Sequence, residues 1–147
     1  MLARDGGIVS EFAIRPMVST DEPFVYRAWL EGAWSHFPGN IVMPKGEFMQ
    51  RWHELIELIL DDQRNSAVVA HVEGQPDMLL GFAVGEARCL HWAYVKQAFR
   101  GMGIATAMIG AIDRVHDNIN IQCRAISHWA GRIEGWRYAP ELLKEYV

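Results

Sequence analysis

The passage from an apolar run through a glycine-containing turn into a helix, over residues 89–112, constrains the fold of this chain more than any other stretch. The run is rich in aromatic and β-branched residues, and the turn that follows it reads Arg-Gly-Met-Gly. After the turn, apolar residues recur with the 3.6-residue period of an amphipathic helix, at Ile104, Met108, Ala111, Ile112 and Val115. The pattern predicts a strand, a tight turn and a helix in direct succession.

The turn has the chemistry of an anion site. A helix N-terminus directs backbone N–H groups and the positive end of the helix dipole toward one point. Gly101 and Gly103 let the backbone approach an anion closely, and the Arg100 guanidinium is a planar donor suited to phosphate. Two common phosphate sites do not fit, because the chain lacks the Lys-Ser or Lys-Thr of NTPase loops and has Thr106 where a dinucleotide fingerprint needs a small residue.

Length and composition limit the remaining classes of protein. The 147 residues are enough for one domain with a core and few for two, so we expect a single domain over residues 1–147. A net charge of −4 and a pI of about 5.8 argue against nucleic acid as a partner. The chain begins without an apolar signal region, and its longest apolar run is far shorter than a membrane span. We therefore expect a cytoplasmic protein, and we expect Cys89 and Cys123 to be free thiols.

Alternation, helix-start signals and turn residues predict the order β-α-α-β-β-β-α-β, followed by a short C-terminal end. The expected strands are 8–18, 66–72, 78–87, 89–95 and 122–129, with a turn at 74–77 between the second and third; the expected helices are about 19–34, 45–62 and 104–116.

Arg100, Gly103 and Ala105 follow directly on a strand that ends in Tyr-Val-Lys. This Arg-x-x-Gly-x-Ala pattern resembles the acyl-CoA signature of the GCN5-related N-acetyltransferase (GNAT) superfamily, which reads Gln/Arg-x-x-Gly-x-Gly/Ala. The resemblance covers about residues 12–136 and implies an α/β fold with a mixed, mostly antiparallel central sheet flanked by helices. The C-terminus is shorter than in usual members and resembles the end of short acetyltransferase-like proteins carried by bacteriophages.

The resemblance implies acetyl-CoA as the cosubstrate. Its pantetheine arm would lie along the fourth strand like an added strand, and its pyrophosphate would bind the amides after Arg100. The implied cofactor-binding residues are Ala93, Tyr94, Val95, Arg100, Gly101, Met102, Gly103, Ile104, Ala105 and Thr106.

Acyl transfer to an amine needs a base for the amine and an acid for the departing thiolate. Glu86 and His91 are the candidates nearest the expected amine, although a solvated strand-end charge and a core histidine are alternatives for them. Gly131 occupies the position at which the family spacing would give a tyrosine acid. His128 or Tyr138 could replace that tyrosine, with core packing as the alternative for Tyr138.

The acceptor pocket is expected in the loop between the first two helices, which carries Trp34, Ser35, His36 and Phe37. A hydrophobic plug against the sheet is the alternative for this loop. The six histidines have no paired metal-ligand spacing, so we expect no metal.

Three functions remain open: an acetyl-CoA-dependent N-acetyltransferase acting on an amine of a small molecule or protein, a catalytically degenerate CoA-binding module that serves as a partner or sensor, and a phage-type enzyme that modifies a nucleobase or a host protein. Apolar residues near the C-terminus predict either a tail folded onto the last strand or a homodimer contact. These residues are Trp136, Tyr138, Leu142 and Leu143.

Overall fold

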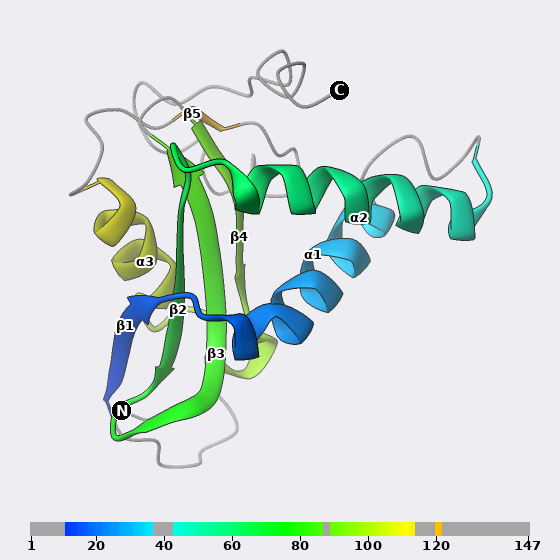
Figure 1. Cartoon of the computed structure of the whole chain (residues 1–147). Helices are drawn as coiled ribbons and strands as arrows, with labels where there is room; N and C mark the ends of the chain where they lie inside the picture. Colours follow the sequence, from blue (N-terminus) through cyan, green and yellow to red (C-terminus); the bar gives the residue numbers. More distant parts are fainter. Residues whose placement is uncertain (1–10, 37–42, 87–88, 114–119, 122–147) are drawn as a thin grey trace.

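Five strands form one sheet in the part of the chain that the structure describes, and helices cover both of its faces (Figure 1). This computed structural model describes residues 11–36, 43–86, 89–113 and 120–121. The pair α1 and α2 lies on one face of the sheet, and α3 lies on the other. In chain order the elements are β1 (Phe12–Pro16), the 3-10 helix η1 (Ser19–Asp21), α1 (Glu22–His36), α2 (Lys45–Asp61), β2 (Ser66–Val72), β3 (Gln75–Glu86), β4 (Cys89–Val95), the 3-10 helix η3 (Gln97–Phe99), α3 (Ile104–Asp113) and β5 (Asn120–Ile121).

The sheet is mixed and mostly antiparallel. Strands β1 to β4 pair antiparallel in chain order, and β5 joins the free edge of β4 in parallel. The parallel pairing joins Cys89 with Asn120 and Leu90 with Ile121. Beyond Leu90, none of the described residues pairs with this edge of β4. The predicted α/β fold class, a mixed and mostly antiparallel sheet between helices, is confirmed.

The hairpin between β2 and β3 is tighter than the sequence predicts. A turn was expected over residues 74–77, but β3 begins at Gln75, which pairs with Val72 across the turn. Gly74 makes this tight turn possible because its φ is 81°, in the left-handed region that glycine adopts without strain. The prediction was wrong because the first residues of β3 have the composition of a turn.

The other boundaries agree closely where the structure describes them. The strands predicted at 66–72 and 89–95 are observed at those residues, and α2 ends at Asp61. Helix α1 continues to His36, so the start of the expected loop is helical. The strand predicted at 122–129 lies outside the described residues.

Apolar side chains pack against both faces of the sheet. On the α1–α2 face, the indole of Trp29 stacks on that of Trp92 with ring centroids 6.0 Å apart and ring planes 24° apart. On the α3 face, Ile104, Met108 and Ile112 are each at most 1% exposed, which confirms the helical stripe predicted at these positions. The burial of both faces explains why β3 and β4 read as nearly continuous apolar runs.

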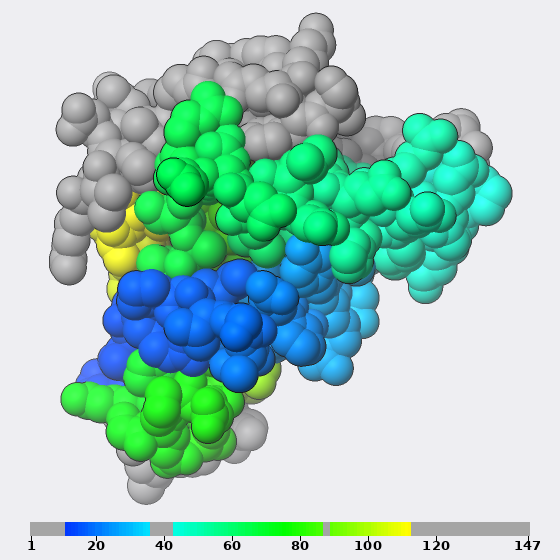
Figure 2. All heavy atoms as spheres, in the orientation of Figure 1, coloured from blue at the N-terminus to red at the C-terminus, as the bar shows by residue number. Residues whose placement is uncertain are grey.

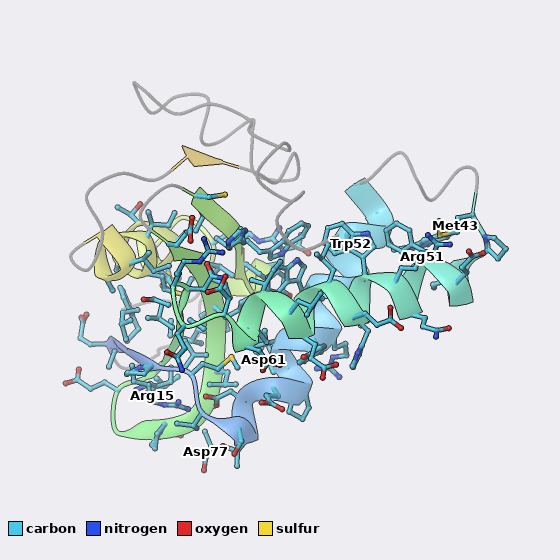
Figure 3. The ribbon with its side chains drawn as sticks, turned by 45° about the horizontal axis from the view of Figure 1, so that its top comes forward. Arg15, Met43, Arg51, Trp52, Asp61 and Asp77 are labelled. Carbon is cyan, nitrogen blue, oxygen red and sulfur yellow. The ribbon has the colours of Figure 1, made fainter. Side chains whose placement is uncertain are left out.

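A partly buried ion pair fixes the start of α1 against the sheet. The Arg15 guanidinium donates hydrogen bonds to both carboxylate oxygens of Asp21 at 2.7 and 2.9 Å, and to the carbonyl of Pro76 at 2.9 Å. Asp21 also accepts a hydrogen bond from the backbone N–H of Val18. The hydrogen bond from Arg15 is the main reason that the pKa of Asp21 lies below its ordinary value. The hydrogen bond to Asp21 is likewise the main reason that the pKa of Arg15 is raised, and Asp77, at the same end of the sheet (Figure 3), adds to that rise.

The first half of α2 projects sideways from the body of the molecule together with the end of α1 (Figures 1 and 2). Met43 lies at this outer end and Asp61 at the inner end (Figure 3). The Trp34 and Phe48 rings meet edge to face at 5.2 Å, and the Lys45 ammonium lies 5.8 Å from the Trp34 ring. Aromatic contacts therefore hold the two helices together. Among the helices that can be described, none combines the length and apolar character needed to cross a membrane.

Candidate functional site

A cavity of about 640 Å³ opens between α1, the second half of β4 and the first turn of α3. Its walls are a helix face, a strand and a turn, and these elements are far apart in the sequence. The residues that line it are Ala28, Glu31, Gly32, Ser35, Trp92, Ala93, Tyr94, Val95, Phe99, Arg100, Gly101, Gly103, Ile104, Ala105, Thr106 and Ile109.

The turn before α3 has the backbone geometry that the sequence predicts for an anion site. Gly101 and Gly103 have φ angles of 83° and 82°, which side-chain-bearing residues rarely adopt. A Cβ at Gly103 would meet nothing within 4 Å, so the backbone conformation, and not lack of space, favours glycine there. The first helical hydrogen bond runs from the Ala107 N–H to the Gly103 carbonyl. The N–H groups of residues 104–106 therefore have no acceptor within the helix, and all three residues line the cavity.

Arg100 adds a fixed positive charge beside these amides. Its Nε donates a hydrogen bond to the Val95 carbonyl at 2.8 Å, and its guanidinium carbon lies 5.8 Å from the centre of the Tyr94 ring. These two contacts hold the side chain at the end of β4, where it lines the cavity. An anion at the helix start would meet both backbone donors and a guanidinium.

Nearly the whole expected cofactor set meets in this one cavity. All of these residues line it except Met102, which is half-buried and packs against the core on the α3 face. Most of the α1 wall was missed by sequence reasoning: Ser35 was expected in the acceptor pocket, but Ala28, Glu31 and Gly32 were not. These four residues recur at three- and four-residue spacing on one helix face, and the small residues among them were the available signal.

Strand β4 contains a bulge directly after the residues that pair with β5. Val84 pairs with Trp92 but Gly85 pairs with Leu90, so His91 is an extra residue in β4. Cys89 and Leu90, just before the bulge, pair with the described residues of β5. From Trp92 onward, β4 lines the cavity.

His91 and Glu86, the candidate bases, are buried near this bulge and do not line the cavity. The His91 Nε2 lies 3.0 Å from the Asn65 Oδ1. Because the Asn65 amide nitrogen donates to the Ile59 carbonyl, its oxygen faces the ring and Nε2 must carry the proton. The remaining ring nitrogen, Nδ1, lies 3.9 Å from the Cys89 sulfur.

Glu86 is 5% exposed, so the alternative of a solvated strand-end charge is wrong. One of its carboxylate oxygens lies 4.0 Å from the Arg64 Nε. Cys89 is a buried free thiol, as predicted. His128, Tyr138 and Cys123 lie outside the described residues, as does the C-terminal tail on which the dimer prediction rests.

The expected acceptor loop is divided between two environments. Ser35 lines the cavity from the last turn of α1. Trp34 instead packs against Phe48 of α2, which agrees with the alternative of a hydrophobic plug for that residue. Phe37 lies outside the described residues.

Comparison with known proteins finds similarity in structure alone. No protein-family model matches the sequence, and no curated protein matches it. Solved structures do match. A Pyrococcus furiosus protein described as a candidate acetyl transferase has a TM-score of 0.64 and 19% identity, over 88% of this chain and 96% of that one. An aminoglycoside N-acetyltransferase in complex with CoA has a TM-score of 0.54 and 18% identity, over 88% and 90% of the two chains.

A third structure, a GCN5-related N-acetyltransferase from Rhodopseudomonas palustris, has a TM-score of 0.57 and 14% identity, over 85% of this chain and 82% of that one. The chain has the GNAT fold. Identities this low establish the fold alone, but the likeness inferred from Arg100, Gly103 and Ala105 is confirmed at that level. The glycine turn before α3 is thus part of a GNAT fold in this chain.

Proposed function

We propose that this protein is an acetyl-CoA-dependent N-acetyltransferase that acts on an amine of a small molecule or a protein. The observation that carries the proposal is the cavity itself. It joins a glycine turn, the amides of the first turn of α3, an arginine and the second half of β4, within the GNAT fold. One structure with this fold contains bound CoA, and that protein is an aminoglycoside N-acetyltransferase, which supports both the cosubstrate and an amine acceptor.

Acetyl-CoA fits the cavity in one direction. The pyrophosphate would bind the amides of residues 104–106 and the Arg100 guanidinium, while the pantetheine arm extends back along β4 from Val95 toward Trp92. Three residue steps along a strand cover about 10 Å. The thioester would therefore approach the bulge at His91.

The reaction needs only positioning and proton transfer. The neutral amine nitrogen attacks the thioester carbonyl carbon, a C–N bond forms and the C–S bond breaks. The amine gives up one proton, and the CoA thiolate takes one to leave as the free thiol. His91 is one candidate base, because it lies at the bulge that the thioester would approach and Asn65 holds a proton on its Nε2. Glu86, His128 and Tyr138 are the other candidates for the two proton transfers.

A CoA-binding module without turnover is the second candidate function. One observation favours it: neither Glu86 nor His91 lines the cavity. Binding of acetyl-CoA without acetyl transfer to any amine would identify such a module.

The test measures binding and transfer separately. Acetyl-CoA should raise the melting temperature of the wild-type protein, and Arg100→Ala should weaken acetyl-CoA binding by about 1–3 kcal/mol, the scale of a charge-assisted hydrogen bond. Mass spectrometry of small amines and proteins incubated with acetyl-CoA should then detect acetylated products. A wild-type protein that does not bind acetyl-CoA at millimolar concentration would overturn the proposal.

A further inference from the structure

The α1 wall gives the cavity a charged end that the cofactor does not need. Among the described residues that line the cavity, Glu31 is the one carboxylate and Arg100 the one cationic side chain. Arg100 belongs to the glycine turn before α3, where the pyrophosphate is expected to bind. Glu31 belongs to α1, with Gly32 beside it and Ser35 one turn later on the same helix face.

The two charges lie at opposite ends of the cavity because α1 runs antiparallel to β4. Phe24, near the start of α1, lies 6.1 Å from the Tyr94 ring and 5.4 Å from the Lys96 ammonium. Farther along α1, a Cβ on Gly32 would lie 2.6 Å from the Trp92 ring. From its start to its end, α1 therefore runs from the Arg100 end of β4 back to Trp92. Glu31 lies at the Trp92 end.

This end of the cavity presents hydrogen-bond acceptors. The Ser35 hydroxyl donates its proton to the Glu31 carbonyl at 3.0 Å, so its oxygen lone pairs remain for another partner. The Glu31 carboxylate accepts hydrogen bonds only, and no residue in the described ranges forms an ion pair with it. Trp92 lies beside them on the cavity wall, with 3% of its surface exposed. A ligand that satisfies this set must carry N–H donors and positive charge.

We infer that the acceptor carries two amino groups: one remains an ammonium bound by Glu31 and Ser35, and the other reacts. This inference rests on the proposed function and names the substrate class of the same site. The bound ammonium keeps its protons throughout. The second amine, neutral when it attacks, forms the C–N bond and releases one proton as the C–S bond breaks and the thiol leaves. Glu31 is thus a specificity determinant for diamines, polyamines or amino sugars.

The experiment compares amines that differ by one ammonium. Calorimetry would measure binding of 1,3-diaminopropane, 1,4-diaminobutane and 1,5-diaminopentane to the CoA-loaded protein, each against the monoamine of the same chain length. The kcat/KM values with acetyl-CoA would be measured for the same pairs. The variant is Glu31→Gln, which keeps the size of the side chain and removes its charge. The matched control is Glu54→Gln, an exposed residue of α2 outside the cavity.

The wild-type protein and Glu54→Gln should prefer at least one diamine over its monoamine by about threefold or more, the scale of a partly screened ion pair. Glu31→Gln should lose this preference because diamines bind more weakly, so that the ratio of diamine to monoamine binding falls toward one. Three results would each overturn the inference: the wild type uses diamines and monoamines equally, it binds none of these amines, or its preference survives Glu31→Gln. Acetyl-CoA binding and transfer to monoamines would in that case still support the proposed function, and failure to bind acetyl-CoA would remove both.

Discussion

Gly74 and Gly103 have almost the same backbone conformation in different surroundings. Their φ angles are 81° and 82°, and a Cβ at either would meet nothing within 4 Å. Glutamate at either position should therefore cost a similar strain, about 1–2 kcal/mol. Gly103→Glu also brings a carboxylate to the expected pyrophosphate site, so we expect it to abolish the thermal shift caused by acetyl-CoA, while Gly74→Glu retains that shift. Retention by both variants would show that the anion site lies elsewhere.

The candidate bases and acids can be separated by their effect on rate. Alanine at the position that acts as base should lower kcat by about 10²–10⁴-fold and leave acetyl-CoA affinity unchanged. We expect His91→Ala to have this effect and to remove the acid limb of the pH–rate profile, because a histidine base is inactive once protonated. Glu86→Ala, His128→Ala and Tyr138→Ala complete the series. Activity within a few-fold of wild type in all four would mean that bulk water carries the protons.

The residues that make up the cavity differ in how much of their role can be read from the sequence. Arg100, Gly101 and Gly103 could be assigned because a local turn followed by a helix determines their geometry. The contact of His91 with Asn65 could not, because it joins residues 26 positions apart through the loop after α2. Glu31 was also missed, since a single charge on an amphipathic helix usually indicates a solvated face.

At the scale of elements, the contact between β3 and β4 depends on Gly81. A Cβ at Gly81 would collide with the Tyr94 carbonyl oxygen and lie 3.1 Å from the Val95 Cα. A Cβ at Gly110 in α3 would meet nothing within 4 Å. We expect Gly81→Ala to lower the free energy of unfolding by about 1–3 kcal/mol or more, because of this collision. Gly110→Ala should raise it by about 0.5–1 kcal/mol, because alanine favours the helix. Urea denaturation of both variants would measure the two effects, and equal midpoints would contradict the packing described for β3.

Strands and helices were predictable where burial alone determines the pattern. The strand at 89–95 is almost wholly apolar apart from His91 and was assigned at both ends, as was 66–72. The start of β3 was not, because pairing across the Gly74 turn overrides the polar composition of its first residues. The bulge at His91 also leaves no local signal, since it depends on the register of β3 against β4.

For the whole molecule, Asp21 should make stability depend on pH in the acid range. Its pKa in the folded protein is lowered, first by the hydrogen bond from Arg15. The stabilisation is therefore fully present above the unfolded pKa, about 3.9, and is lost as the pH falls through the lower folded pKa. Asp21→Asn should lower the free energy of unfolding by about 1–3 kcal/mol at neutral pH and by less in acid. Unfolding followed from neutral to acidic pH, with the exposed Asp61→Asn as control, measures this, and a loss independent of pH would refute it.

The stacking of Trp29 on Trp92 has an optical consequence for work on this protein. One indole faces the cavity while the other is sealed in the core, with their planes 24° apart. Two such rings in van der Waals range couple their electronic transitions and contribute strongly to near-ultraviolet circular dichroism. A molecule that enters the cavity changes the surroundings of one member of the pair and so alters the shared signal. The protein thus carries a spectroscopic reporter of occupancy that needs no attached dye.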